Sequence, residues 1–288
     1  MSNSTEHNDS PEFGERPQEF VPVTVGPLTI CLARDEKDIR ASQRLRYDVF
    51  YREMSARPDD ATAREERDFD RYDDICDHLI VLDDSLGQGA DAIVGTYRLL
   101  RRSVAENSGG FYTADEFDVS RLLKRSNGLL ELGRSCIHAD YRRGSTMQLL
   151  WQGIAQYVFN HDIQYMFGCA SIEGTDPDEL ALPLSYLAYN HAADASICPE
   201  ALPNRYVDMK RLARDEIDDR SALRSVPPLI KGYLRLGGTI GEGAVVDEQF
   251  GTTDVCVVVE TQRVTDKYFK HYTRKAGQID AQSDVAAE

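Results

Sequence analysis

Two charged residues stand inside an apolar segment near the middle of the chain. Glu131 and Arg134 lie in the run LLELGRSCIH, which predicts a buried strand over residues 129–138. Side chains alternate between the two faces of a regular strand, so these two would point in opposite directions. Gly133 between them indicates a β-bulge, which would bring both to one face and open a slot beside the strand. Arg98, on the preceding predicted strand, would join them.

A carboxylate and two arginines at such a slot can do chemistry. They can orient an amine nucleophile or the carbonyl of a thioester. The alternative is a buried ion pair with a purely structural role, which is common in proteins. The residue pattern alone leaves both interpretations open.

A second candidate site follows at the end of the same strand, where a turn leads into a predicted helix over residues 146–160. Main-chain N–H groups and the dipole at a helix start bind anions such as phosphate, and arginines in the turn add positive charge. The turn has a single glycine, whereas a glycine-rich phosphate loop has more. A plain strand–helix turn with its serine or threonine as N-cap explains the segment equally well. The turn consists of Arg142, Arg143, Gly144, Ser145 and Thr146.

An acidic segment, REERDFDRYDDICD, occupies residues 64–77. Asp68 and Asp70 in it are candidates to bind the ammonium group of a cationic small molecule. Their DxD spacing is also found at metal sites, but no flanking His or Glu completes a ligand set, so we predict no metal. The alternative is a solvated acidic loop. Cys136 and Cys169 stand in predicted strands and are expected in the core.

The elements that must position these residues alternate between strands and helices, which predicts an α/β fold with a mixed sheet. Residues 1–26 are expected to be a disordered arm, and residues 276–288 a flexible tail. Residues 27–275 then form one domain, in which residues 176–228 are an insertion or lid. Strands are predicted at 28–33, 78–82, 92–100, 129–138, 164–172, 244–246 and 254–260, and helices at 36–54, 146–160, 180–189 and 228–234.

Composition excludes several protein classes. The chain has 288 residues, 41% of them hydrophobic, and a formal net charge of −16. An acidic chain is a poor nucleic-acid binder, because phosphate contacts need a basic face. The chain has no run of 18 apolar residues, so no membrane span is predicted. Its N-terminus is neither basic nor apolar, so no signal peptide is predicted. Six dispersed cysteines without a CxxC motif favour reduced thiols and a cytoplasmic location.

Several segments together resemble the acyl-carrier-protein-dependent N-acyltransferases of bacterial aminolipid synthesis, best known as L-ornithine Nα-acyltransferases. The resemblance covers residues 28–272 and depends on the order and spacing of its pieces. It implies a variant of the Gcn5-related acyltransferase fold, in which a bulged strand and the following turn and helix hold a pantetheine thioester. The segments are RLRYDVF (44–50), RDFDRYDDICDHLIV (67–81), GTYR (95–98), ELGRSCIHADYRRGST (131–146), FGCASIEGTD (167–176), LSY (184–186), PPLIKGYLRLG (227–237) and TTDVCVVV (252–259).

The resemblance implies transfer of a 3-hydroxyacyl group from acyl carrier protein to the α-amine of L-ornithine, with no separate cofactor. Glu131 would then be the base, and main-chain N–H groups near Ser135 and Cys136 would polarise the thioester. An arginine would hold the acceptor's carboxylate, and Asp68 or Asp70 its side-chain ammonium. The turn would hold the phosphate of the phosphopantetheine. Related acyl-homoserine lactone synthases match at Arg46, Phe50, Asp68, Asp70, Arg98, Glu131 and Arg134.

Other functions remain open alongside this one. An acyl-homoserine lactone synthase would carry a Trp after the first helix, whereas Trp151 stands in the later one. A coenzyme A-dependent acetyltransferase of small amines and a non-catalytic lipid-interacting protein are further alternatives, and weak peripheral membrane contact is compatible with a lipid product. Glutamine, lysine or glycine would be alternative acceptors. Because acyl carrier proteins are acidic, docking requires a basic patch, with candidates Arg101, Arg102, Lys124, Arg125, Arg142 and Arg143.

Overall fold

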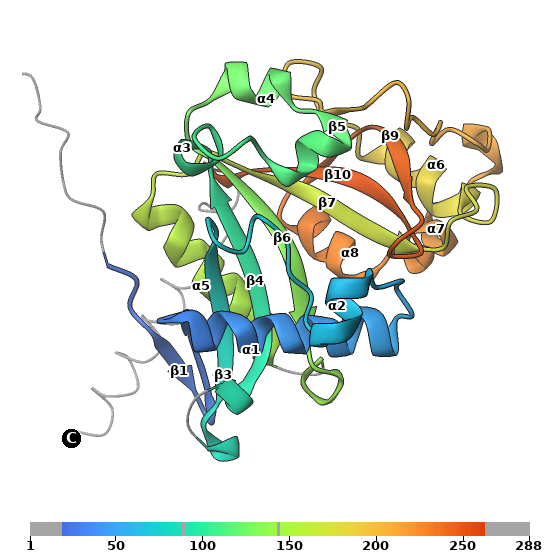
Figure 1. Ribbon diagram of the computed structural model, residues 1–288. Coiled ribbons are helices and arrows are strands. Elements are labelled where there is room, and N and C mark those ends of the chain that lie inside the picture. The colour runs from blue at the N-terminus through green and yellow to red at the C-terminus, as the bar shows by residue number, and fades with distance from the viewer. Residues whose placement is uncertain (1–18, 88–89, 143–144, 263–288) are drawn as a thin grey trace, which may run out of the picture.

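The computed structural model describes residues 19–87, 90–142 and 145–262, and a ten-stranded sheet runs through them (Figure 1). Its strand order is β1-β2-β3-β4-β6-β7-β10-β9-β8-β5. The pairs β6–β7 and β8–β9 are parallel and the others antiparallel, which confirms the predicted mixed sheet. The strands are β1 Val23–Val25, β2 Leu28–Leu32, β3 Asp77–Asp83, β4 Ile93–Arg101, β5 Phe117–Asp118, β6 Leu129–Ile137, β7 Tyr165–Glu173, β8 Glu200–Ala201, β9 Thr239–Asp247 and β10 Thr252–Glu260.

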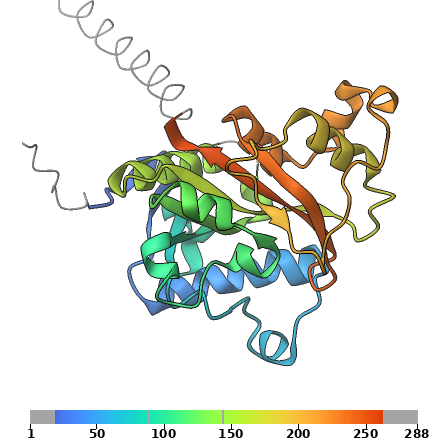
Figure 2. The same ribbon diagram turned by 90° about the horizontal axis from the view of Figure 1, so that it is seen from above.

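The two longest helices, α1 and α5, cover opposite faces of this sheet, as the view from above shows (Figure 2). Strand β3 explains the layers: Leu79 and Val81 pack with α5 residues, while Ile80 and Leu82 pack with α1 residues. This alternation follows from the two-residue period of a strand that is buried on both sides. The helices are α1 Glu36–Tyr47, α2 Asp60–Glu65, α3 Arg102–Ala105, α4 Ser120–Arg125, α5 Ser145–Asn160, α6 Ala181–Asn190, α7 Asp219–Ser225 and α8 Pro228–Arg235.

The helix predicted over residues 36–54 is present, but its last part is wound differently. Asp35 caps α1 by accepting hydrogen bonds from the main-chain N–H groups of Lys37 and Asp38. After Tyr47 the chain continues as a π-helical segment, Asp48–Glu53. Such wider turns occur often at functional sites. This one directs Phe50 toward the cavity described below.

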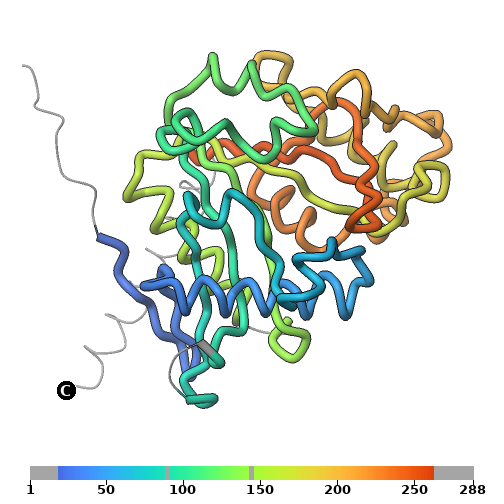
Figure 3. Tube along the Cα trace, viewed as in Figure 1, coloured from blue at the N-terminus to red at the C-terminus, as the bar shows by residue number. Residues whose placement is uncertain are grey.

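The strands β6 and β7 pair only at their beginnings and then diverge, so that the sheet forks (Figures 1 and 3). Their register covers residues 129–131 on β6 and 165–167 on β7. At the fork, a Cβ atom on Gly168 would lie 2.2 Å from the carbonyl oxygen of Leu132. Only glycine therefore permits β7 to approach β6 so closely at the point where the two strands part.

The bulge predicted in β6 is confirmed. On the β4 side, Thr96 pairs with Cys136 but Arg98 pairs with Gly133, so β6 carries one extra residue between these pairs. The residue with the left-handed backbone is Arg134, at φ +49°, and not the glycine before it. An arginine in this conformation is unusual and costs about 1–2 kcal/mol. The contacts of its guanidinium, given below, hold it there.

Several elements differ from the sequence prediction. Val23–Val25 forms β1 and pairs with β2, so the disordered arm predicted for residues 1–26 reaches too far into the chain. The helix α2 lies between α1 and β3, where no helix was predicted. Within residues 176–228 the helix predicted at 180–189 is present as α6, but β8, which extends the sheet beside β9, and α7 were not predicted. Elements of two to seven residues have no hydrophobic period to detect. The tail predicted for residues 276–288 lies outside the described residues, as do residues 1–18.

The helices in the described ranges include none that is long and apolar enough to cross a membrane.

Candidate active site

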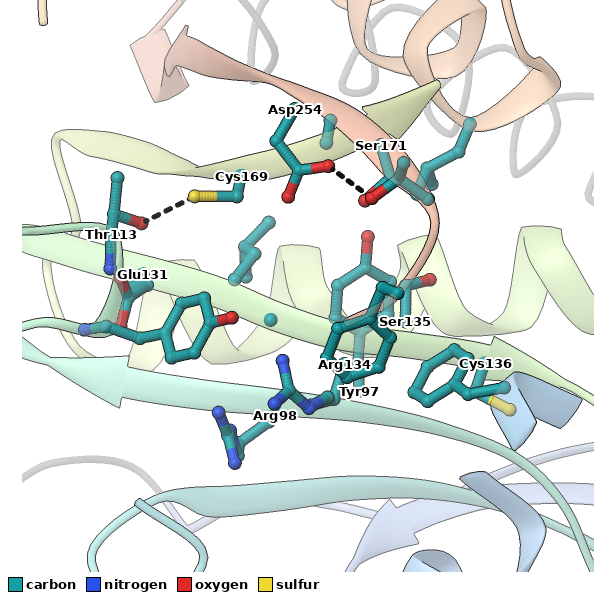
Figure 4. A pocket seen from close by; sticks show the side chains of 18 of the residues that line it. Tyr97, Arg98, Thr113, Glu131, Arg134, Ser135, Cys136, Cys169, Ser171 and Asp254 are labelled. Atoms are coloured by element: carbon teal, nitrogen blue, oxygen red, sulfur yellow. Dashed lines mark hydrogen bonds between the residues drawn. The ribbon is translucent and has the colours of Figure 1, made fainter. Parts of the chain in front are cut away.

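A cavity of about 310 Å³ lies along β6 where this strand leaves β7 (Figure 4). Its floor is β6 from Glu131 to Ile137, and its upper wall comes from β7 and β10. Tyr233 of α8 and the turn at Phe250 close its sides. The slot that the sequence predicted beside a bulged strand is therefore present. Among the predicted site residues, the cavity wall includes Phe50, Arg98, Glu131, Arg134, Ser135, Cys136 and Arg142.

Three arginines and three aspartates form a network beneath one side of the cavity. Arg46 donates to Asp68 at 2.7 Å and to Asp73 at 2.8 Å. Arg98 donates to Asp70 at 2.7 Å. Arg134 reaches both Asp68 and Asp70 at 3.2 Å. The six charges cancel, and the network anchors the bulge by holding the guanidinium of Arg134 against the acidic loop.

This network changes the role of three predicted ligands. Asp68, Asp70 and Arg46 do not line the cavity, and the Arg46 side chain is 0% exposed. Burial acts against ionisation of both aspartates, but the arginines outweigh it, Arg134 first at Asp68 and Arg98 first at Asp70, so the pKa of each is lowered. Neither aspartate lines the cavity, whereas Arg98 and Arg134, which they hold, both do. The two aspartates and Arg46 belong to the framework that positions Arg98 and Arg134.

Glu131 lies at the base of the fork and is 5% exposed. Its carboxylate accepts main-chain hydrogen bonds from Thr113 at 2.6 Å and from Tyr112 at 3.0 Å. Burial raises the pKa of Glu131, and these hydrogen bonds only partly oppose it. Glu131 therefore holds the loop before β5, and it also places a carboxyl group of raised pKa in the cavity wall.

A chain of hydroxyl groups lines the opposite end of the floor. The Tyr97 and Tyr233 oxygens lie 2.5 Å apart, and the Ser135 hydroxyl hydrogen-bonds to Tyr97. Burial raises the pKa of both tyrosines, so they stay protonated and can donate a proton. Sequence reasoning missed these tyrosines as site residues. They stand within the quoted segments GTYR and PPLIKGYLRLG, but nothing local shows that the two meet.

The predicted donor-binding turn is described in part. Arg142 lines the cavity, donates to the carbonyl of Ile137 at 3.0 Å, and pairs with Glu53 at 2.7 Å. Thr146 is buried near the start of α5. Arg143 and Gly144 lie outside the described residues. Cys136 is buried, and its thiol contacts the carbonyl of Leu45 at 3.8 Å. Burial raises the pKa of that thiol, which leaves it a neutral part of the wall.

An acidic cluster that sequence reasoning missed faces the arginines across the cavity (Figure 4). The ligand atoms of Glu116, Cys169 and Asp254 lie within 4.8 Å of one another. Asp254 is 5% exposed and accepts hydrogen bonds from the hydroxyls of Thr252, at 2.9 Å, and Ser171. The signal that could have found it was available, because Asp254 interrupts the apolar run TTDVCVVV as Glu131 interrupts its own.

The electrostatics of this cluster differ from those of the arginine network. The Cys169 thiol donates to Glu116 at 3.3 Å, and Arg205 approaches Glu116 only to 3.6 Å. Burial, together with the charge of Asp254, raises the pKa of Glu116 to about 7. Burial, with a smaller contribution from Asp247, raises the pKa of Asp254 to about 6. These carboxylates are thus short of positive partners.

Comparisons with known proteins match a family model and several solved structures. The family described as "Acetyltransferase (GNAT) domain" matches residues 45–152. Two solved structures are similar in fold: FeeM, an N-acyl amino acid synthase from uncultured soil microbes, and the AHL synthase LasI. The first has a TM-score of 0.47 at 10% identity over 85% of this chain and 95% of that chain. The second has a TM-score of 0.43 at 14% identity over 81% and 89%.

Curated relatives are much more similar. The L-ornithine N(alpha)-acyltransferase of Brucella abortus (strain 2308) is 48% identical over 88% of this chain and 92% of that protein. The proteins of the same name from Agrobacterium fabrum (strain C58) and Rhodobacter capsulatus are 46% and 42% identical. The Agrobacterium match covers 89% of this chain and 88% of that protein. The Rhodobacter match covers 88% of this chain and 98% of that protein. With this identity along nearly the whole of each relative, and with an acyltransferase domain at its centre, the chain belongs to the L-ornithine N(alpha)-acyltransferase family.

Proposed function

We propose that this protein transfers a 3-hydroxy fatty acyl group from acyl carrier protein to the α-amine of L-ornithine, which gives lyso-ornithine lipid. The observation that carries the proposal is membership of the family together with a cavity at the fork of β6 and β7. That cavity combines main-chain donors, a buried carboxylate and paired tyrosine hydroxyls along one strand. These are the groups that an amide-forming attack on a thioester needs.

The acyl donor lies along β6 in this proposal. Past Glu131 the edge of β6 that faces β7 has no partner strand, so main-chain N–H groups there are free to bind the thioester oxygen. We assign this role to the bulge around Ser135 and Cys136. The phosphate of the phosphopantetheine then sits at the start of α5 beside Arg142, where the helix dipole favours an anion. A turn with one glycine suits a single phosphate better than a nucleotide diphosphate.

The amino acid occupies the other half of the cavity. Arg134, at the wall, offers its guanidinium to the α-carboxylate. Glu131, directly or through a water molecule, takes a proton from the α-ammonium, because an amine must be neutral to attack. Its oxygens accept main-chain hydrogen bonds from Tyr112 and Thr113 and a further one from the Thr113 hydroxyl, which still leaves one lone pair for this task.

The reaction closes with loss of the thiol. The amine nitrogen forms a bond to the carbonyl carbon, and the carbon–sulfur bond breaks. Glu131 first passes the proton of the ammonium group to water and then accepts the second proton, which the nitrogen loses as the amide bond forms. The Tyr97–Tyr233 pair donates a proton to the departing thiolate and regains one, through water, from Glu131. Burial raises the pKa of both tyrosines, so both are protonated before the thiolate forms.

The partner surface follows from where the phosphate must enter. Arg101, Arg102, Lys124 and Arg125 lie near the start of β6, whereas Arg142 lies beyond its end, roughly 25 Å away at the usual rise of a strand. The basic residues predicted as one patch therefore form two groups. We propose that acyl carrier protein docks at the Arg142 group, beside the start of α5. A cytoplasmic location, with weak contact to the inner face of the membrane where a lipid product would partition, completes the proposal.

A product assay tests this function. The purified full chain is mixed with 3-hydroxypalmitoyl acyl carrier protein and a panel of free amino acids, and products are identified by mass spectrometry. N-acylornithine is the expected product. No product with any amino acid, from protein that melts cooperatively, would overturn the proposal. Parallel mixtures with S-adenosylmethionine or acetyl-coenzyme A test the lactone synthase and acetyltransferase alternatives.

A further inference from the structure

The two sides of the cavity are unequal in charge balance. Beneath the floor, the arginine–aspartate network already pairs every one of its six charges. Across the cavity, Glu116 and Asp254 are both at least 95% buried. Within the described residues Arg205 approaches Glu116 to 3.6 Å, and the charge of Arg134 only partly offsets the burial of Asp254. The upper wall of the cavity therefore presents buried negative charge that the protein itself leaves largely uncompensated.

Buried carboxylates without a cation are costly, so they are retained where a ligand or a proton supplies the positive charge. The hydroxyls of Thr252 and Ser171 orient Asp254 but bring no charge. Asp254 also lines the cavity, together with Cys169 and Ser171 of β7. A cation that enters the cavity can therefore reach this carboxylate without moving any main chain.

The chemistry of the cluster favours an ammonium group over a metal ion. The Cys169 thiol is engaged as a hydrogen-bond donor to Glu116 at 3.3 Å, and Glu116 itself does not line the cavity, so the three groups do not converge on one point of the cavity wall. Without the thiol, two carboxylates remain, whereas zinc and calcium sites need three or more protein ligands. An ammonium group instead needs hydrogen-bond acceptors and negative charge, which both carboxylates provide.

The placement matches a dibasic amino acid. Arg134 lies on β6, the floor of the cavity, and Asp254 lies on β10 in its upper wall (Figure 4). If Arg134 holds the α-carboxylate, the side chain of the acceptor extends toward β10. We propose that Asp254, assisted by Glu116, binds the side-chain ammonium group of the acceptor and so selects a dibasic amino acid. This inference rests on the proposed function and adds its specificity determinant.

The test compares ornithine with norvaline, which has the same carbon skeleton without the side-chain ammonium. Calorimetric binding and acyl transfer are measured for wild-type protein and for Asp254→Asn. We expect the variant to bind ornithine about 10- to 100-fold more weakly, the usual effect of losing a charged hydrogen bond, and to raise its KM correspondingly. Norvaline binding should change by less than about threefold, because no contact to it is lost. An unchanged ratio of ornithine to norvaline affinity would overturn the inference.

Controls separate the possible failures. Asn keeps the shape of Asp254, accepts a hydroxyl hydrogen bond through its amide oxygen and donates to a hydroxyl oxygen through its amide nitrogen. Glu116→Gln gives a second variant if the first does not fold. Asp208→Asn, at an exposed aspartate outside the cavity, should leave both affinities unchanged. Wild-type protein that binds ornithine through Asp254 but transfers no acyl group would contradict the proposed function and leave this inference standing. Activity lost on chelation and restored by zinc alone would overturn the inference in favour of a metal.

Discussion

The cavity has two charged walls that are built in opposite ways. Under the floor, arginines and aspartates meet in direct pairs at 2.7–3.2 Å and neutralise one another. On the β7–β10 wall, Glu116 and Asp254 gather around a neutral thiol with one arginine at 3.6 Å. The first arrangement stabilises the bulge in β6 whether or not substrate is present. The second leaves charge for a ligand, so burial of ionisable groups has a structural meaning on one wall and a functional one on the other.

The largest effect is expected from breaking the paired wall. Arg46→Ala removes a buried ion-pair partner from both Asp68 and Asp73, and breaking a buried pair typically costs about 3–5 kcal/mol. Chemical denaturation measures this loss. The matched control is Arg40→Ala, an exposed arginine paired with Glu36 on the same helix, which should change stability by less than about 0.5 kcal/mol. Equal effects of the two variants would remove the distinction between framework and surface charges.

Glu131 lies at the base of the fork, between the two charged groups. Its replacement tests whether it acts as a base or only holds the structure. Glu131→Gln keeps the shape and one acceptor for the loop N–H groups but cannot take a proton. We expect kcat to fall about 100- to 1,000-fold, in line with loss of general base catalysis, while the melting transition stays cooperative. Near-normal turnover in steady-state assays would exclude Glu131 as the base and point to a carboxylate of the β7–β10 wall.

The dependence of the free energy of unfolding on pH distinguishes the two groups of buried carboxylates. In the folded protein, burial raises the pKa of Asp254 to about 6 and that of Glu116 to about 7, above their ordinary values of 3.8 and 4.5. The folded state therefore holds their protons more tightly, so these groups destabilise the protein increasingly as the pH rises from about 4 to about 7. Asp68 and Asp70, with lowered pKa values, add stability as the pH rises, but only below about pH 4.

Denaturation at about pH 5 and about pH 7.5 measures this difference. Asp254→Asn should remove about 1–2 kcal/mol of the stability that wild-type protein loses between those values. Asp247, Arg134 and Arg205 are shared by both proteins and cancel in the comparison. Glu116 adds to the difference in the same direction, because its pKa falls when the charge of Asp254 is removed. Saturating ornithine should restore the lost stability in wild-type protein only. The same pH dependence in both proteins would show that Asp254 is not strained by burial.

The smallest effect is expected outside both walls. Arg142→Glu reverses the charge at the proposed entrance for the phosphopantetheine and breaks the pair with Glu53. We expect the KM for acylated carrier protein to rise about fivefold, since an exposed charge contributes about 1 kcal/mol, with the KM for ornithine unchanged. Lys124→Glu, at the other end of β6, is the control and should change neither constant. A larger rise in the KM for acylated carrier protein with Lys124→Glu than with Arg142→Glu would indicate that the carrier protein docks at α4 instead.

The sequence alone determined the order of the main strands and helices, the bulge in β6 and the slot beside it. These depend on local features: a two-residue hydrophobic period, a glycine within a charged pair, and a turn that leads into a helix. Resemblance to a family added the reaction and pointed to Arg98, Glu131 and Arg134, which do line the cavity. The same local reading marked Asp68 and Asp70 as ligands, because it could not see their arginine partners.

Only the tertiary structure decided which charges are already paired and which are left for a ligand. Tyr97 and Tyr233 meet across 136 residues of chain, and Arg134 reaches Asp68 across 66. Glu116 and Asp254 likewise come from distant segments that the sheet brings to one wall. Periodicity reports whether a side chain is buried but not what it is buried against, and the charge balance of a site depends on the second property.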